Sequence, residues 1–450
     1  MSGLPNRNLG RGGVCPQTDH PGGKSPTRRT LLKVGSLGIL SGLTLPRLIR
    51  ARAASAEGAR KTSVIYLELA GGPSQFETYD PKPDAPREYR GMFGSIPTTL
   101  AGIRFCDLMP RQARILDKLA IVRSIRHRHN SHDPSSHLVQ SGYYKVGPKG
   151  GPNQFPCIGS TISKLRGPNA HGLPAYAAIP KVMRNGRAAF LGNSYDPFEV
   201  GNDPNAPDFN VKNLVLEDGL TIPRLQGRRE LLTSLDQARR FVDTSGVGES
   251  IDRFTAEALE LVTGERARKA FDLSREDDRL RDLYGRHPFG QGMLLARRLV
   301  EAGVTIATVR IPGWDDHSNI EPAMNAKGPP YDQAITALIS DLHLRGLDRD
   351  VLVVAIGEFG RTPRVNKKAG RDHWGPLMSV LFAGGGVRGG NIIGASNANG
   401  EVPIETEYHP NNVLATIYRH LGVDPASTIT DFSGRPHHLL DRHEVIRELY

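Results

Sequence analysis

Residues 304–317 read VTIATVRIPGWDDH and give the clearest indication of the fold class. This stretch begins with a β-branched, apolar run that predicts a buried strand, and polar residues follow where that strand would end. Helical patterns occupy residues 290–302 and 332–344, and further apolar runs at 351–356 and 377–383 predict two more strands. Strands that alternate with helices predict an α/β fold, with a mostly parallel sheet flanked by helices on both faces.

The N-terminal half adds strands to the same sheet. The run TSVIYLEL at residues 62–69 predicts the first strand, and the tight loop AGGPS follows it at residues 70–74. Residues 119–122 predict a short strand that leads into a histidine-dense loop. From about residue 160 to 286, Pro/Gly-rich segments and charged helical stretches predict a cap inserted into one domain that spans residues 57–450.

Composition and charge exclude several classes of protein. The 450 residues are 38% hydrophobic and 23% charged, which excludes collagen, coiled coils and polytopic membrane proteins. The net charge of +11 is concentrated in residues 1–56, which hold nine Lys/Arg and one Asp and leave a net charge of +3 for the rest of the chain. A nearly neutral body gives no support for nucleic acid as a partner.

The basic N-terminal segment has the pattern of a targeting sequence. Residues 25–33, SPTRRTLLK, resemble a twin-arginine export signal, and the apolar run at 34–45 is too short to form a stable transmembrane anchor. Residues 1–56 are therefore predicted to be an export signal read by the twin-arginine machinery, which would make the protein periplasmic or secreted. The alternative is a buried N-terminal helix with an incidental arginine pair. Cys106 and Cys157 either pair or remain two buried thiols.

Carboxylates and imidazoles cluster where the predicted strands end. In sheets of this type the ligand site lies beyond the carboxyl ends of the strands, so these side chains are expected to converge on one edge. Two imidazoles with carboxylates suit zinc, and manganese or iron when more oxygen ligands are present. The predicted metal ligands are Asp315, His317, Glu358 and His373.

Two arginines lie beside those ligands in the sequence. Arg361 and Arg371 are predicted to bind a phosphate or sulfate group, because a guanidinium forms bidentate hydrogen bonds to such oxygens. The alternative is that each arginine forms an ion pair with Glu358 or Asp372.

The loop RHRHNSH at residues 126–132, with His137, places four histidines within eleven residues. Such a loop suits metal binding or general acid–base catalysis, and its alternative is a solvated basic loop. Ser74, Ser131 and Ser135 are candidate nucleophiles, although water activated by a metal would need none of them.

Several motifs together resemble a bacterial family of unassigned activity, the domain of unknown function 1501, which is abundant in planctomycetes. The resemblance extends from about residue 61 to residue 450. The motifs are GGPS at 71–74, DPKPDAP at 80–86, LLARRLVEAGV at 294–304, WDDH at 314–317, GEFGRTP at 357–363 and GRDHW at 370–374.

That family is similar in fold to the alkaline phosphatase superfamily, which includes sulfatases. The resemblance implies that Asp315 and His317 bind metal after one strand and that His373 binds metal before another. Glu358 and Phe359 stand where the superfamily has Asp-His, which implies a weakened second metal centre. The superfamily's first strand ends in a metal-binding Asp, so either Glu68 replaces that residue here or the ligand is missing.

The sulfatase nucleophile motif is absent, because His132 stands at the position that sulfatases convert to formylglycine. The sequence and the resemblance together predict an exported, metal-dependent hydrolase of sulfate or phosphate esters, acting on a small-molecule or polysaccharide anionic ester. His132, Ser74 and Arg361 are the predicted catalytic residues. Zinc is the first candidate metal, with manganese, iron or calcium as others. The alternative is a catalytically degenerate scaffold that binds acidic polysaccharide or another anionic partner.

Overall fold

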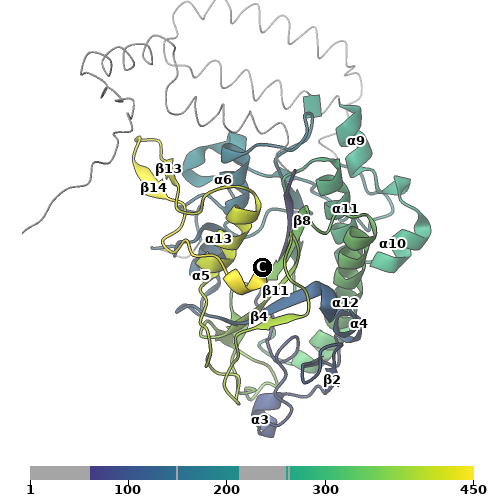
Figure 1. The fold of residues 1–450 in the computed structure, drawn as a ribbon, viewed down its shortest axis with the longest axis vertical. Coiled ribbons are helices and arrows are strands. Elements are labelled where there is room, and N and C mark those ends of the chain that lie inside the picture. The colour runs from purple at the N-terminus through teal and green to yellow at the C-terminus, as the bar shows by residue number, and fades with distance from the viewer. Residues whose placement is uncertain (1–60, 148–149, 212–259, 262–263) are drawn as a thin grey trace, which may run out of the picture. The chain divides into compact units, whose positions relative to one another are not determined.

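The computed structural model describes residues 61–147, 150–211, 260–261 and 264–450, so the predicted export signal lies outside the described residues. A central eight-stranded sheet has the order β12-β4-β11-β8-β1-β7-β5-β6 (Figure 1). Its strands are β1 (Ser63–Leu69), β4 (Leu119–Ile125), β5 (Tyr176–Ile179), β6 (Phe198–Glu199), β7 (Ile306–Ile311), β8 (Val351–Ile356), β11 (Met378–Gly384) and β12 (Asn391–Ile393).

One strand of this sheet runs against the others. The parallel pairs are β1 with β7 and β8, β5 with β6 and β7, and β12 with β4. Strand β11 is antiparallel to both of its neighbours, β8 and β4. A parallel return would need a crossover, usually a helix, but the chain passes from β8 to β11 through the small hairpin β9 (Gly360–Arg361) and β10 (His373–Trp374). The start of β11 therefore lies at the sheet edge where β8, β1 and β7 end.

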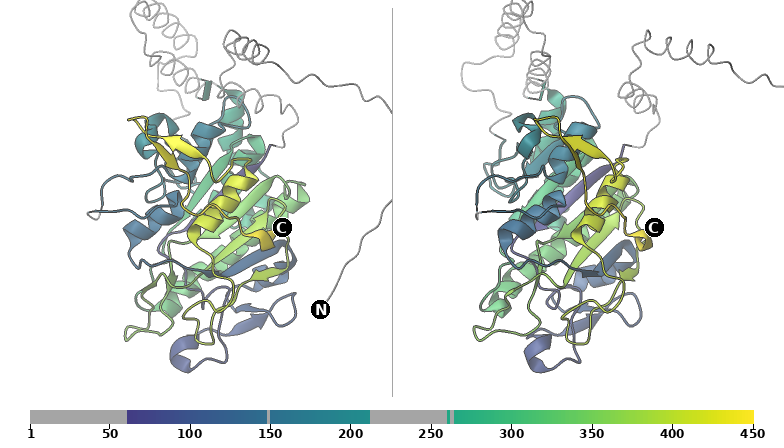
Figure 2. Two further views of the ribbon diagram at one scale, coloured as in Figure 1. Left: turned by 60° about the vertical axis from the view of Figure 1, so that its left-hand side comes forward. Right: turned by 90° about the vertical axis from the view of Figure 1, so that its left-hand side faces the viewer.

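Helices cover both faces of the sheet (Figures 1 and 2). Alternate residues of β1 point to opposite faces, with Ile65 and Leu67 in one apolar core and Val64 and Tyr66 in the other. The first core is covered by α4 (Pro110–Arg114), α9 (Glu265–Phe271), α10 (Asp278–Tyr284), α11 (Pro288–Ala302) and α12 (Ile320–Leu344). The second is covered by α5 (His132–Ser141), α6 (Ile158–Leu165) and α13 (Pro410–His420). The predicted fold class is confirmed.

The range predicted as a cap belongs in part to the sheet itself. Strands β5 and β6 pair with each other, and β5 also pairs with β7, so this portion of the range from about residue 160 to 286 contributes strands to the central sheet. Their apolar runs are too short to predict a strand from sequence. Residues 212–259 and 262–263 lie outside the described residues, so a cap in that part of the chain stays a prediction.

Helix α12 begins at Ile320, twelve residues before the predicted start at Asp332. Pro329 and Pro330, which lie inside this helix, make the sequence read as a break. The helix continues through them because Ile320 and Met324 are buried in the core on the N-terminal side of the prolines.

Smaller elements complete the described part. These are α3 (Arg87–Arg90), the hairpin β2 (Ser95–Pro97) and β3 (Arg104–Cys106), and the hairpin β13 (Thr428–Thr430) and β14 (Pro436–His438). Cys106 and Cys157 are separate, buried thiols. Among the helices of the described residues, none has the length and apolar character needed to cross a membrane.

Candidate metal centre

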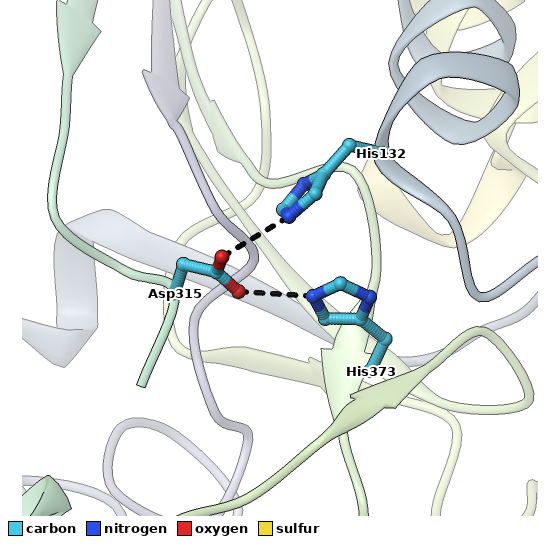
Figure 3. Close-up of side chains that lie close together, drawn as sticks. All are labelled: His132, Asp315 and His373. Carbon is cyan, nitrogen blue, oxygen red and sulfur yellow. Dashed lines mark hydrogen bonds and ion pairs between the residues drawn. The ribbon is translucent and has the colours of Figure 1, made fainter. Parts of the chain in front are cut away.

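Four polar side chains meet beyond the carboxyl edge of the sheet. His132 is the first residue of α5, which follows β4; Asp315 and His317 follow β7; and His373 lies on β10. One potential ligand atom from each of His132, Asp315 and His373 lies within 4.8 Å of the others (Figure 3). Because β11 is antiparallel, a histidine that precedes it reaches the same edge as residues that follow β4 and β7.

All three imidazoles turn the same ring nitrogen toward one carboxylate. The Nε2 atom of His132 lies 3.1 Å from Oδ2 of Asp315, and Nε2 of His373 lies 2.9 Å from Oδ1 (Figure 3). The Nε2 atom of His317 lies 3.1 Å from the same Oδ1 and 2.9 Å from Nε2 of His373. Ligands of a tetrahedral zinc ion at about 2.0–2.1 Å lie roughly 3.3 Å apart, so these separations match a metal-binding set closely.

The other nitrogen of each ring, Nδ1, donates a hydrogen bond to an oxygen that can act only as an acceptor. The Nδ1 of His132 donates to Oε1 of Glu358 over 2.7 Å. The Nδ1 of His317 donates to Oδ1 of Asp372 over 2.7 Å, and Nδ1 of His373 donates to the backbone carbonyl of Asn130 over 2.9 Å. This arrangement fixes the tautomer and orientation of a histidine that binds metal.

The donor set itself indicates a cation. When Nδ1 carries the proton of a neutral imidazole, Nε2 presents a lone pair. Three such lone pairs then face each other and the Asp315 carboxylate, and this arrangement of acceptors is repulsive unless protons or a metal ion lie between them. The side chains of His132, Asp315, His317 and His373 therefore fit a divalent transition metal.

Asp315 is held in its charged form. Partial burial alone would raise the pKa of Asp315, but the hydrogen bond from Arg361 and the contacts with His373 and His132 outweigh that effect and hold its pKa well below the usual range. An Nη atom of Arg361 lies 2.6 Å from Oδ1. The pKa of His373 is lowered, mainly by burial, which favours the neutral ring that a metal requires.

Glu358 has a different place from the predicted one. Its carboxylate accepts a hydrogen bond from Nδ1 of His132. The carboxylate also accepts from the backbone N–H of Gly71, whose nitrogen lies 3.1 Å from Oε1 and 3.0 Å from Oε2. Gly71 has φ +116°, and a Cβ atom there would lie 2.5 Å from the backbone nitrogen of Asp315, so the turn after β1 requires glycine. The structure thus gives Glu358 the role of positioning His132, where the sequence predicted a metal ligand.

Replacing Glu358 with glutamine is expected to weaken metal binding by about 10- to 100-fold, the usual effect of losing a partner that orients a ligand. The amide oxygen of the glutamine can still accept a hydrogen bond from Gly71 or His132, but the negative charge of the carboxylate is lost. The measurement is metal affinity by competition with a chromogenic chelator. Glu405→Gln, at an exposed glutamate, is the matched control. Equal affinities for the two variants would contradict the positioning role.

Both predicted anion-binding arginines serve the protein itself. Every guanidinium nitrogen of Arg361 donates to a protein oxygen, and its side chain is fully buried. Arg371 is equally buried and donates to the carboxylate of Glu77 at 3.0–3.1 Å and to the carbonyls of Tyr89, Thr362 and Pro363. Neither arginine is therefore free to bind a substrate anion, and the ion pairs are made with partners other than Glu358 and Asp372.

Ser74 also belongs to the interior. Its hydroxyl donates to Oε2 of Glu77, and the side chain is buried beside the Glu77–Arg371 ion pair. This contact assigns Ser74 to the support of the loop after β1, where the sequence predicted a nucleophile. The Ser135 hydroxyl likewise donates to the backbone carbonyl of His129.

Apolar and neutral groups form one wall of the centre. The ring of Phe359 is buried, with its centroid 4.3 Å from the ring centroid of His373 and 5.2 Å from that of His132. Burial lowers the pKa of His127 to about 4, and its Nδ1 accepts from the His129 N–H, so Nε2 donates to the carbonyl of Glu358 over 2.8 Å. Phe359 therefore packs against two candidate ligands from the position where the resemblance would place another ligand.

Three supporting groups were missed from the sequence: the carboxylate of Asp372, the carbonyl of Asn130 and the N–H of Gly71. Asp372 directly precedes His373 in the sequence. Its hydrogen-bond partner is His317, which lies 55 positions away, and the order of the residues gives no indication of that pairing. The motif GRDHW contains the signal, since a carboxylate beside a candidate ligand is a common partner for a second histidine. The backbone groups carry no signal in sequence.

The family model described as "Protein of unknown function (DUF1501)" matches residues 61–450. No curated protein matches the chain. The chain is similar to Ps i-CgsB in a complex with k-i-k-neocarrahexaose, with 10% identity, a TM-score of 0.40 and coverage of 81% of this chain and 72% of that one.

Two further solved structures are similar to the chain at the same low level. The PsFucS1 sulfatase from Pseudoalteromonas sp. has 12% identity and a TM-score of 0.37, with coverage of 83% of this chain and 70% of that one. The alkaline phosphatase from the Antarctic bacterium TAB5 has 11% identity and a TM-score of 0.35, with coverage of 81% and 98%.

Proposed function

This chain belongs to the DUF1501 family, and from the geometry of its candidate metal centre we propose that it is an exported, metal-dependent hydrolase of sulfate or phosphate esters. The observation that carries the proposal is the convergence of three imidazole Nε2 atoms on Asp315, with each Nδ1 atom held by an acceptor. A cluster prepared in this way binds a transition metal without rearranging its ligands.

Zinc is the proposed ion, with iron or manganese next. Three nitrogen ligands and one carboxylate suit these ions, whereas calcium takes oxygen ligands almost exclusively. The donor set therefore argues against calcium, the fourth candidate from the sequence. When bound, the ion supplies Lewis-acid chemistry that polarises an ester and activates water.

The chain's own residues organise this chemistry. Asp372, Glu358 and the carbonyl of Asn130 orient the three imidazoles, and Arg361 keeps Asp315 ionised. Phe359 excludes water from one side of the imidazoles. Because the hydroxyl of Ser74 is committed to Glu77, the proposal uses water as the nucleophile and leaves no catalytic step to that serine.

The substrate class, an anionic ester on a small molecule or polysaccharide, comes from the resemblance to the alkaline phosphatase superfamily. Export by the twin-arginine route agrees with the pattern of residues 25–33 and would deliver the folded, metal-loaded protein to the periplasm or beyond.

The test is elemental analysis of the purified mature protein, followed by a panel of aryl sulfates and aryl phosphates. About one equivalent of zinc, iron or manganese is expected, with hydrolysis that is lost on dialysis against a chelator and restored by the same ion. A well-folded protein that neither contains nor takes up these metals would overturn the proposal. Stoichiometric metal without turnover on any ester would favour the binding scaffold instead.

A further inference from the structure

Two arginines flank a buried glutamate at the edge of the sheet that carries the metal centre. Arg310, on β7, is the register partner of Glu68 on β1, and Nε of Arg310 lies 3.4 Å from Oε2 of Glu68. The side chain of Arg310 remains 38% exposed, so its guanidinium reaches solvent. Within the described residues, these two atoms are buried and neither has a hydrogen-bond partner.

Arg184 also lies near Glu68, on the segment that follows the neighbouring strand β5. Strand β5 ends at Ile179, which is paired with β7 one residue before Arg310, and the chain continues to the exposed Arg184. The next residue, Asn185, donates its side-chain N–H to the carbonyl of Asp133 over 3.1 Å. Asp133 directly follows His132, so the loop that carries Arg184 lies against the start of α5, where a candidate metal ligand sits.

Glu68 does not neutralise this pair at neutral pH. Burial, with the nearby charge of Glu358, raises the pKa of Glu68 to about 8, against the opposing effect of Arg310 and Arg184. Among the described residues, a mostly protonated Glu68 leaves the guanidinium groups of Arg310 and Arg184 without an ionised partner, and such cations favour the binding of an oxyanion from solution.

We propose that Arg310 and Arg184 form an anion-binding subsite, which holds the sulfate or phosphate group of the ester beside the metal centre. The inference rests on the proposed function for the identity of its ligand. It assigns to this pair the role that the sequence suggested for Arg361 and Arg371, whose guanidinium groups are buried.

The test is calorimetric titration of the metal-loaded, full mature protein with sodium sulfate and, separately, sodium phosphate. Arg310→Gln is expected to weaken the affinity for the bound anion by at least about tenfold, because a charge-assisted contact is lost. Arg184→Gln should weaken it less, since this side chain is more exposed, and Arg310→Lys should keep part of the affinity. Arg114→Gln, at an exposed arginine on α4, should leave it unchanged.

The two anions distinguish the two sources of the ligand. Tighter binding of sulfate assigns the subsite to sulfate esters, and tighter binding of phosphate assigns it to phosphate esters. Absence of binding by the wild-type protein, or equal affinities in Arg310→Gln and Arg114→Gln, would overturn the subsite.

A second measurement keeps the proposal testable if Arg310→Gln does not fold. Sulfate stays ionised across the range, so its affinity for the wild-type protein should fall several-fold between pH 7 and pH 9, as Glu68 ionises and pairs with Arg310. Glu68→Gln should remove this fall. The other titratable groups facing Glu68 are Glu358, Tyr66 and Tyr176, which are the same in both proteins. Identical pH profiles would count against the subsite.

The outcomes separate the subsite from the proposed function. Loss of anion affinity in Arg310→Gln, in a protein that hydrolyses no ester, would leave the subsite standing and remove the hydrolase. Metal-dependent hydrolysis with unchanged anion affinity in Arg310→Gln would support the hydrolase and remove the subsite.

Discussion

His373→Ala is expected to remove the bound metal and, with it, hydrolysis of any ester that the wild-type protein cleaves. The Nε2 atom of His373 lies 2.9 Å from both Oδ1 of Asp315 and Nε2 of His317, so it is a central member of the ligand set. Loss of a partner that only orients a ligand costs about 10- to 100-fold in metal affinity. Loss of a ligand should therefore cost at least about a hundredfold.

The measurement is metal content after gel filtration together with the rate on the best ester of the panel. His343→Ala is the matched control, because His343 is partly exposed on α12 and its ion-pair distance to Asp348 is 3.6 Å. His373→Gln serves as a second variant, since alanine also removes the ring that packs on Phe359. Stoichiometric metal in both His373 variants would show that the cluster is not the metal site.

Arg361→Met is expected to destabilise the protein by at least about 3 kcal/mol, because losing the buried guanidinium leaves several buried carbonyl acceptors without a donor, at about 1–3 kcal/mol each. The guanidinium joins three segments: the loop after β1 through Gly72, the loop after β7 through Asp315, and the segment before β10 through the carbonyl of Arg371. Methionine fills a similar volume, so the loss would come from unpaired acceptors rather than from a cavity.

The check is urea unfolding followed by circular dichroism, with Arg364→Met as the control at an exposed arginine three residues away. The Arg361 variant should also bind metal more weakly, because Asp315 loses a hydrogen bond that lowers its pKa. An unfolding midpoint equal to that of the Arg364 variant would contradict the structural role and reopen the predicted role in anion binding.

The sequence predicted most of the sheet correctly. The runs at residues 62–69, 304–311 and 351–356 correspond to β1, β7 and β8 to within two residues at each end. Buried strands carry continuous apolar, β-branched sequence, which is a local property that can be recognised without knowing their neighbours. The short strands β5 and β6 lack that signal, and sequence patterns alone place them within the predicted cap range.

The candidate site was predicted in part for a related reason. Asp315, His317 and His373 lie close together, as expected for polar residues next to the ends of buried strands, and their binding of metal stays a prediction. The sequence predicted a catalytic role for His132. Its place in the candidate cluster depends on contacts with Asp315 and Glu358 across 183 and 226 positions of the chain.

From local patterns alone, then, the sequence predicted the α/β architecture and the edge of the sheet where the candidate metal ligands lie. The tertiary structure alone decided the antiparallel direction of β11, the positioning role of Glu358 and the burial of Arg361 and Arg371. The physical reason is that hydrophobic patterning is written in neighbouring residues, whereas the partner of a charged side chain is chosen by whichever acceptors the folded chain brings within hydrogen-bond distance. For Arg361 those acceptors lie up to 290 positions away.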